Sequence, residues 1–171
     1  MKPAPSEGWL IKAVDYAPTN ASPFSVNSGL VQKDATALIE KSRSEEKFAT
    51  TQVDIVAHSM GGLITRKTME DPAYLRPDNF KKGDVRRLVT LTTPHWGSQF
   101  ANLLINLHNN FNHGNPGLDY LEAFLRENVD ADVHRGAVCD LAENSPAMAF
   151  QAGDVTPFNG NGRAYSASNG P

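Results

Sequence analysis

The chain has 171 residues, of which 40% are hydrophobic and 20% charged, an ordinary composition for a globular protein with one core. Its net charge of −3 provides no basic surplus for nucleic-acid binding, and no stretch approaches the roughly 18 apolar residues of a membrane span. A single cysteine, Cys139, excludes an intrachain disulfide, and we expect neither a metal site nor a cofactor.

The first apolar segment is residues 9–16, WLIKAVDY, followed by a loop rich in Pro, Asn and Ser at 17–29. This pattern predicts a buried strand and the loop after it. We then expect an amphipathic helix that begins near Leu30 and fades in the charged residues 41–47. Its apolar positions are Leu30, Val31, Ala35, Leu38 and Ile39.

Two further strand and helix pairs follow. Residues 52–59, QVDIVAHS, are nearly continuous in apolar character, which is typical of a strand buried on both faces of a parallel sheet. The next helix starts at once and must end before Pro72. Residues 85–94, VRRLVTLTTP, predict another buried strand, and residues 98–107, SQFANLLINL, predict another helix.

The last part of the chain is weaker in pattern. Asn115 can cap a helix that starts at Pro116, and residues 163–171, RAYSASNGP, indicate a short strand that stops at its own turn. Strands that alternate with helices predict an α/β fold, with a parallel sheet covered by helices and a working site at the carboxyl ends of the strands. We expect a single domain over residues 1–171.

Ser59 lies between a strand and a helix, where a sharp turn lifts a hydroxyl above the sheet if its neighbours are small. Ala57 and Gly61 stand two residues to either side, and Gly62 follows. The helix that begins at Met60 turns its free N–H groups toward the serine. The backbone N–H of Met60 is therefore the expected donor to an oxyanion.

The segment from Ala57 to Gly62, AHSMGG, resembles the nucleophile elbow of α/β-hydrolase lipases and esterases, with alanine in place of the first glycine. Residues 91–101, LTTPHWGSQFA, resemble the Thr-Pro-His-x-Gly-Ser turn of bacterial and related lipases. Residues 137–148, AVCDLAENSPAM, resemble their Asp-Leu-x-x-x-Ser-Pro segment. The resemblance covers nearly the whole chain.

The resemblance implies a serine hydrolase that cleaves an acyl ester or lipid through an acyl-enzyme on Ser59. It also implies a structural role for His95, which with Trp96 is a candidate wall of the site. Separately, the amphipathic helices with nearby aromatic residues make residues 98–130 a candidate lid in contact with a lipid interface, although such apolar stripes more often belong to a core. No signal peptide is visible, although many lipases of this kind are secreted. The alternative is a noncatalytic binding or scaffold protein that keeps the same turn.

A serine hydrolase also needs a histidine and a carboxylate, which in this fold follow the serine in the order acid, then histidine. The sequence ends where the resemblance would place the acid loop. An internal substitute is His134 as base, with Asp119, Asp130 or Asp132 as its partner. The strand that carries the second oxyanion donor in the family is also not found ahead of residues 9–16. We therefore expect the chain to be the middle of a larger hydrolase, with an exposed sheet edge that favours self-association.

Overall fold

The computed structural model describes residues 10–110 and 136–148, together with isolated helical positions between 116 and 127. The strand expected at residues 163–171 lies outside the described residues. In chain order the elements are the 3-10 helix η1 (Ala17–Thr19), α1 (Phe24–Ser44), β1 (Val53–His58), α2 (Met60–Glu70), the 3-10 helices η2 (Pro72–Tyr74) and η3 (Pro77–Asn79), β2 (Val85–Leu91), α3 (Gln99–Asn110) and α5 (Ala137–Leu141).

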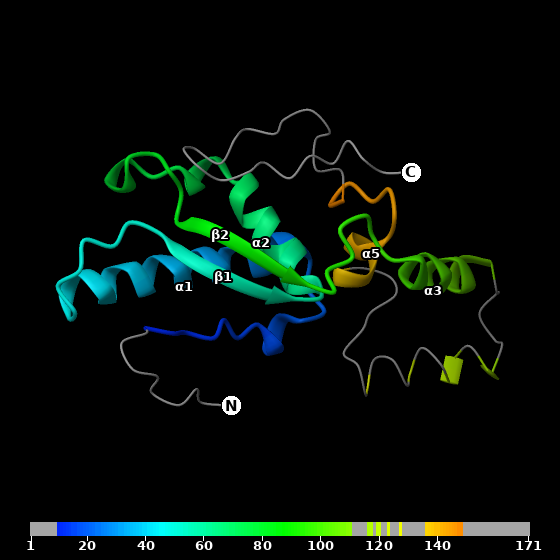
Figure 1. Ribbon diagram of the computed structural model, residues 1–171. Coiled ribbons are helices and arrows are strands. Elements are labelled where there is room, and N and C mark those ends of the chain that lie inside the picture. Colours follow the sequence, from blue (N-terminus) through cyan, green and yellow to red (C-terminus); the bar gives the residue numbers. More distant parts are fainter. Residues whose placement is uncertain are drawn as a thin grey trace.

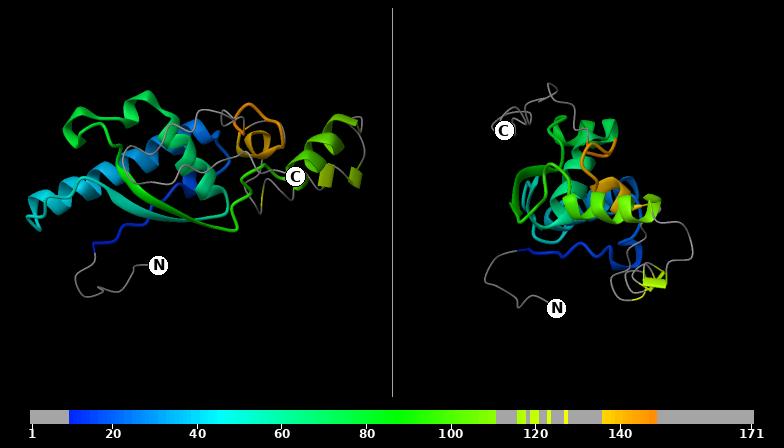
Figure 2. Two further views of the ribbon diagram at one scale, coloured as in Figure 1. Left: turned by 45° about the horizontal axis from the view of Figure 1, so that its top comes forward. Right: turned by 90° about the vertical axis from the view of Figure 1, so that its right-hand side faces the viewer.

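The two strands form a parallel sheet in which Ile55 pairs with Leu88 and His58 pairs with Leu91. Their carboxyl ends therefore meet at one edge of the sheet. Helices α1 and α2 both lie on the same face of this sheet, while α3 and α5 lie beyond the carboxyl ends of the strands (Figures 1 and 2). The parallel strands with flanking helices confirm the predicted α/β class.

The prediction that both strands are buried on both faces is wrong for the described residues. Val56 is 70% exposed and Val89 is 50% exposed, whereas Ala57 is buried. Successive side chains of a strand point to opposite faces, and the helices cover only one of them. His58, two residues after Val56, is likewise exposed on the open side. Continuous apolar character did not distinguish one covered face from two.

Residues 10–16 form no strand in the structure, contrary to the prediction for residues 9–16. Among the described residues β1 pairs only with β2. A strand requires a neighbour with which to exchange backbone hydrogen bonds. Val14 and Tyr16 nevertheless pack against the core, so the apolar residues of this segment are used without the predicted pairing.

Helix α1 begins at Phe24, inside the segment predicted as a loop, and ends at Ser44 within the charged residues where its end was expected. The N-cap position is Pro23, which supplies no side-chain hydrogen bond. Instead, the Asp140 carboxylate accepts a hydrogen bond of 2.6 Å from the Phe24 N–H. A residue distant in sequence thus stabilises the first turn, which explains why local pattern placed the start too late.

The hydrophobic core forms between α1 and α2 and extends to α5. Phe24 and Leu63, from the first and second of these helices, are completely buried in it, and Ala137 joins them from α5. Val138, the next residue of α5, packs instead with Ala101 and Leu104 of α3. Because adjacent residues of α5 belong to the two clusters, this short helix fastens α3 to the rest of the fold.

The later helices agree with the predicted ranges. Helix α2 ends at Glu70, before Pro72, and the described positions between 116 and 127 are helical. Helix α3 is present as expected, but Phe100 and Leu103 on it are 61% and 51% exposed. Within the described part of the chain, no helix has both the length and the apolar character that crossing a bilayer requires.

A buried carboxylate fixes the end of the sheet opposite Ser59. Asp84 is 0% exposed and accepts four hydrogen bonds, from the side chains of Gln32 (2.7 Å), Thr36 (2.8 Å), Arg76 (2.9 Å) and Asn79 (2.7 Å). A buried charge is tolerated only when donors of this kind surround it. These contacts tie α1 and η3 to the start of β2.

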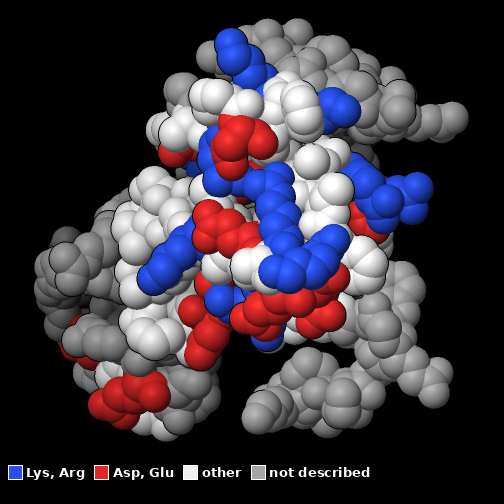
Figure 3. Space-filling view, turned by 90° about the vertical axis from the view of Figure 1, so that its left-hand side faces the viewer, with Lys and Arg blue, Asp and Glu red and all other residues white. Residues whose placement is uncertain are grey.

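The surface at this end carries charges of both signs. Figure 3 shows lysine and arginine side chains interspersed with aspartate and glutamate. Arg86 of β2 pairs with Asp54 of β1, and this hydrogen-bonded guanidinium lowers the pKa of the Asp54 carboxyl. The basic residues around β2 are exposed, as expected for a solvated surface.

Candidate active site

Ser59 occupies the single residue between β1 and α2, and its backbone has a φ of 52° and a ψ of −130°. Few residues other than glycine adopt a positive φ, and such conformations persist only where the surroundings impose them. The side chain is exposed. Although Ser59 is the N-cap of α2, its hydroxyl makes no capping hydrogen bond. The hydroxyl is therefore accessible at the carboxyl edge of the sheet and is not engaged by its own helix.

The small residues around the turn differ in how closely their neighbours approach them. Ala57 is buried beneath the turn. A Cβ on Gly61 would lie 3.4 Å from the Tyr16 hydroxyl and 3.8 Å from the Ala57 Cβ, which are ordinary contacts. A Cβ on Gly62 would lie 2.3 Å from the Thr93 Oγ1. Close packing therefore requires glycine at Gly62 more than at Gly61.

Met60 is the first residue of α2 and is half-buried against the core. A helix leaves the N–H groups of its first turn without intrahelical acceptors, and its positive dipole end lies there. The Met60 N–H consequently belongs to the set that can donate to an anion beside Ser59. Tyr16 lies on the other side of the same turn, and burial raises the pKa of its hydroxyl.

The last residue of β2 and the loop after it hold the backbone of Ser59 directly. The Ser59 N–H donates a hydrogen bond of 2.8 Å to the Leu91 carbonyl oxygen. The Thr93 hydroxyl donates another, also of 2.8 Å, to the Ser59 carbonyl oxygen. Sequence reasoning missed Thr93, although it stands in the quoted segment LTTPHWGS. The feature that could have identified it is its position two residues after β2, the strand that pairs with β1.

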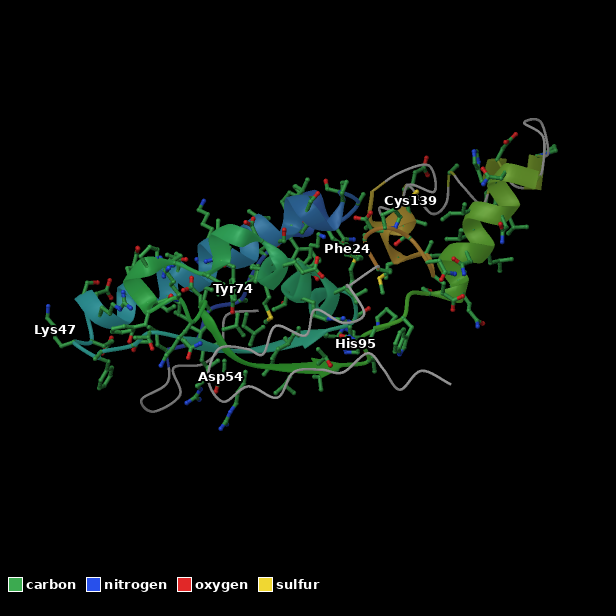
Figure 4. All side chains as sticks on the ribbon, turned by 90° about the horizontal axis from the view of Figure 1, so that it is seen from above. Phe24, Lys47, Asp54, Tyr74, His95 and Cys139 are labelled. Carbon is green, nitrogen blue, oxygen red and sulfur yellow. The ribbon has the colours of Figure 1, made fainter. Side chains whose placement is uncertain are left out.

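His95 lies at the carboxyl ends of the strands (Figure 4) and is held on both sides. Its Nδ1 is 3.0 Å from an Arg66 guanidinium nitrogen, and its Nε2 is 3.0 Å from the Thr90 Oγ1. A guanidinium only donates, so Nδ1 must accept and the proton must reside on Nε2. Burial, with the neighbouring Arg66 charge, lowers the pKa of His95. The ring is therefore neutral and anchors the loop, while Trp96 beside it is 59% exposed.

The substitute base and acid are not brought together by the described structure. His134, Asp130 and Asp132 lie outside the described residues, and Asp119 is an exposed helical position. Among the residues that the structure does describe, no group of three or more histidine, cysteine, aspartate or glutamate side chains is placed to hold a metal ion.

The segment that resembles Asp-Leu-x-x-x-Ser-Pro has a structural use. Besides the bond from Asp140 to α1, the Ser145 hydroxyl donates to the Asp140 carbonyl oxygen at 2.7 Å. The Asn102 and Glu143 residues exchange two hydrogen bonds, of 2.9 and 3.0 Å, between α3 and the end of this segment. The motif therefore fastens α1 and α3 to this segment.

Comparisons with known proteins identify the same region. A family model described as "PGAP1-like alpha/beta domain" matches residues 27–115. "Triacylglycerol lipase 2" from Saccharomyces cerevisiae is 31% identical over 88 residues, which are 52% of this chain and 25% of that protein. "GPI inositol-deacylase" from Mus musculus is 46% identical over 50 residues, which are 29% of this chain and 5% of that protein. No solved structure gives a significant match.

The chain thus aligns with a quarter or less of the length of these two relatives. The matched range extends from α1 to just beyond α3 and includes β1, Ser59, α2 and β2. These matches confirm the resemblance to α/β-hydrolase lipases and esterases. Since the family model covers about half of the chain, the protein belongs to the family of PGAP1-like alpha/beta domains.

Proposed function

We propose that the protein is a serine hydrolase that cleaves acyl esters of lipids, with Ser59 as its nucleophile. The main support is the turn itself, where an exposed hydroxyl that caps no helix stands in a strained backbone conformation between β1 and α2. Strained, preorganised turns of this kind are typical of the nucleophile in α/β-hydrolases. The printed names of the two relatives, a triacylglycerol lipase and an inositol deacylase, support an acyl ester as the substrate class.

In the proposed reaction the Ser59 Oγ attacks the ester carbonyl while a base accepts the hydroxyl proton. The carbonyl oxygen becomes an oxyanion, and the Met60 N–H donates to it at the positive end of α2. Expulsion of the alcohol, which takes up the proton, leaves an acyl-enzyme on Ser59. Water then attacks this acyl group and releases the carboxylic acid. The alkoxy oxygen of the ester leaves with the alcohol, and the proton taken from Ser59 leaves with it.

The base of this reaction is assigned to residues outside the described part of the chain. His95 does not fit the role because both of its ring nitrogens are engaged, by Arg66 and Thr90. Within this chain the candidate is His134, with Asp119, Asp130 or Asp132 as its orienting carboxylate. The engagement of His95 also favours the second candidate function, a noncatalytic binding protein that retains the elbow.

Hydrolysis of a soluble short-chain acyl ester and of an emulsified triacylglycerol, with matched serine variants, separates the two functions. Ser59→Ala should remove hydrolysis, because it removes the hydroxyl that is proposed to attack the ester. Ser44→Ala is the control, since Ser44 is exposed at the end of α1, far along the chain from the turn. Loss in Ser59→Ala alone supports the hydrolase. Equal turnover in both variants would exclude Ser59 as the nucleophile, and no turnover in the unmodified protein supports the binding protein.

A further inference from the structure

Ser59 keeps its unusual backbone because the end of β2 and the loop after it hold it. Its N–H bonds to the carbonyl oxygen of Leu91, the last residue of β2, and its carbonyl oxygen bonds to the Thr93 hydroxyl in the loop. The Gly62 N–H also reaches the Ser59 carbonyl oxygen, at 3.2 Å. That contact is longer than the 2.8 Å bond from Thr93. It also comes from α2, the helix that the turn itself orients.

Thr93 is itself confined on several sides. Its side chain packs so closely on α2 that a Cβ at Gly62 would meet both the Oγ1, at 2.3 Å, and the Cγ2, at 2.7 Å. The preceding residue, Thr92, adopts a φ of 50°, which bends the loop back toward the turn. Two residues later His95 is tethered to β2 and to α2 by Thr90 and Arg66. The hydroxyl of Thr93 is therefore held in position to donate to the Ser59 carbonyl oxygen.

We propose that Thr93 is a positioning residue, whose hydroxyl holds the Ser59 carbonyl and thereby aims the Ser59 Oγ for attack. The inference rests on the proposed hydrolase function and deepens it, because it assigns a role to Thr93, for which the resemblance gave none. The bond fixes ψ of Ser59, and this angle determines how the Met60 N–H and the side chain of Ser59 are oriented relative to each other. Removal of the hydroxyl leaves the nucleophile present but less well aligned.

The test compares three forms of the whole chain in their reaction with a fluorophosphonate, measured as the saturating rate of adduct formation on Ser59. Thr93→Val removes the donor at nearly constant shape and should lower this rate by about tenfold, as small misplacements of a reacting group do. Thr93→Ser retains a hydroxyl and should remain within about twofold of the unmodified chain. The probe concentration at half saturation should not change, because the proposed role of Thr93 is to orient Ser59 and not to bind the probe.

A second readout keeps the inference testable without chemistry at Ser59. Amide hydrogen exchange over residues 53–63 should be faster in Thr93→Val than in Thr93→Ser, because the turn loses one of its holding bonds. If all three forms react and exchange equally, Thr93 has no positioning role although the hydrolase proposal stands. If none reacts while exchange increases in Thr93→Val, the contact holds the turn but the hydrolase proposal fails. A lower melting temperature in Thr93→Val with unchanged rate and exchange overturns the inference and leaves only packing.

Discussion

The Asp140 carboxylate accepts a hydrogen bond of 2.6 Å from the Phe24 N–H, although the two residues are separated by 116 positions in the chain. The bond joins the start of α1 to α5, which packs against both helix clusters of the core. It places a negative charge at the positive end of a helix of 21 residues. The relationship makes the first turn of α1 dependent on a segment that follows the candidate active site in sequence.

Asp140→Ala should lower the free energy of unfolding by about 0.5–2 kcal/mol, the usual cost of losing an N-terminal cap. Asp140→Asn keeps an acceptor oxygen without the charge, so its free energy of unfolding should lie between those of the unmodified protein and Asp140→Ala. Urea denaturation followed by far-ultraviolet circular dichroism measures the series. Equal stability of all three proteins would show that the bond contributes nothing to α1.

The two adjacent glycines of α2 should respond in opposite ways to the same change. Gly62→Ala places a Cβ within 2.3 Å of the Thr93 Oγ1, so the turn or the loop must shift. Overpacking of this kind costs about 1–3 kcal/mol. Gly61→Ala meets only ordinary contacts, at 3.4 Å or more, and gains up to about 1 kcal/mol of helix propensity. Thermal unfolding of the pair measures this. A Gly62→Ala protein as stable as Gly61→Ala would contradict the tight approach of Thr93 to α2.

The start of each element within the motif region could be predicted from sequence, and the reason is local. The small residues around Ser59 and Pro72 beyond α2 act on their own neighbours, so β1, α2 and β2 fall where their patterns place them. The start of α1 could not be predicted, because its cap comes from Asp140. The exposure of Val56 could not either, because apolar character does not reveal which face of a sheet a helix covers.

The candidate site shows the same division. Ser59 and Met60 are identified by their position between a strand and a helix, which sequence reveals. The contact from Thr93 depends on the register of two parallel strands and on the bend at Thr92, which are properties of the folded chain. The role of His95 depends on its contact with Arg66, and no motif or periodicity in the sequence indicates that these two residues meet.

Stability should fall as the pH is lowered through the range in which free histidine titrates. The pKa of His95 is below its ordinary value in the folded protein, because burial and Arg66 disfavour the protonated ring. Its stabilising contribution is therefore complete above the unfolded pKa of about 6.5 and is lost as the pH falls below that value toward the folded pKa.

Urea unfolding at about pH 7 and about pH 5, with His95→Gln as the comparison, tests this dependence. Glutamine does not titrate, so the variant should lose less stability between the two conditions than the unmodified protein. The variant is expected to be less stable at the higher pH, since it cannot reproduce both ring contacts. An identical loss in both proteins would show that His95 does not contribute to the pH dependence.

Asp84→Asn should be among the most destabilising conservative changes in the described fold. An amide nitrogen cannot accept the hydrogen bonds that the lost carboxylate oxygen received, and Arg76 loses its buried counter-charge. The expected cost is about 3 kcal/mol. The matched control is Asp78→Asn, because the Asp78 side chain is 53% exposed and should change stability by less than about 0.5 kcal/mol. Chemical denaturation of both variants distinguishes a buried anchor from a replaceable surface pair.

The most direct test of the central claim is intact-mass spectrometry of the purified chain after treatment with a fluorophosphonate. If Ser59 is an activated nucleophile, one adduct forms on the unmodified chain and on Ser44→Ala, and none forms on Ser59→Ala. An unmodified chain that is folded and remains unlabelled, or a Ser59→Ala protein that is still labelled, would contradict the assignment of Ser59 as the nucleophile of this domain.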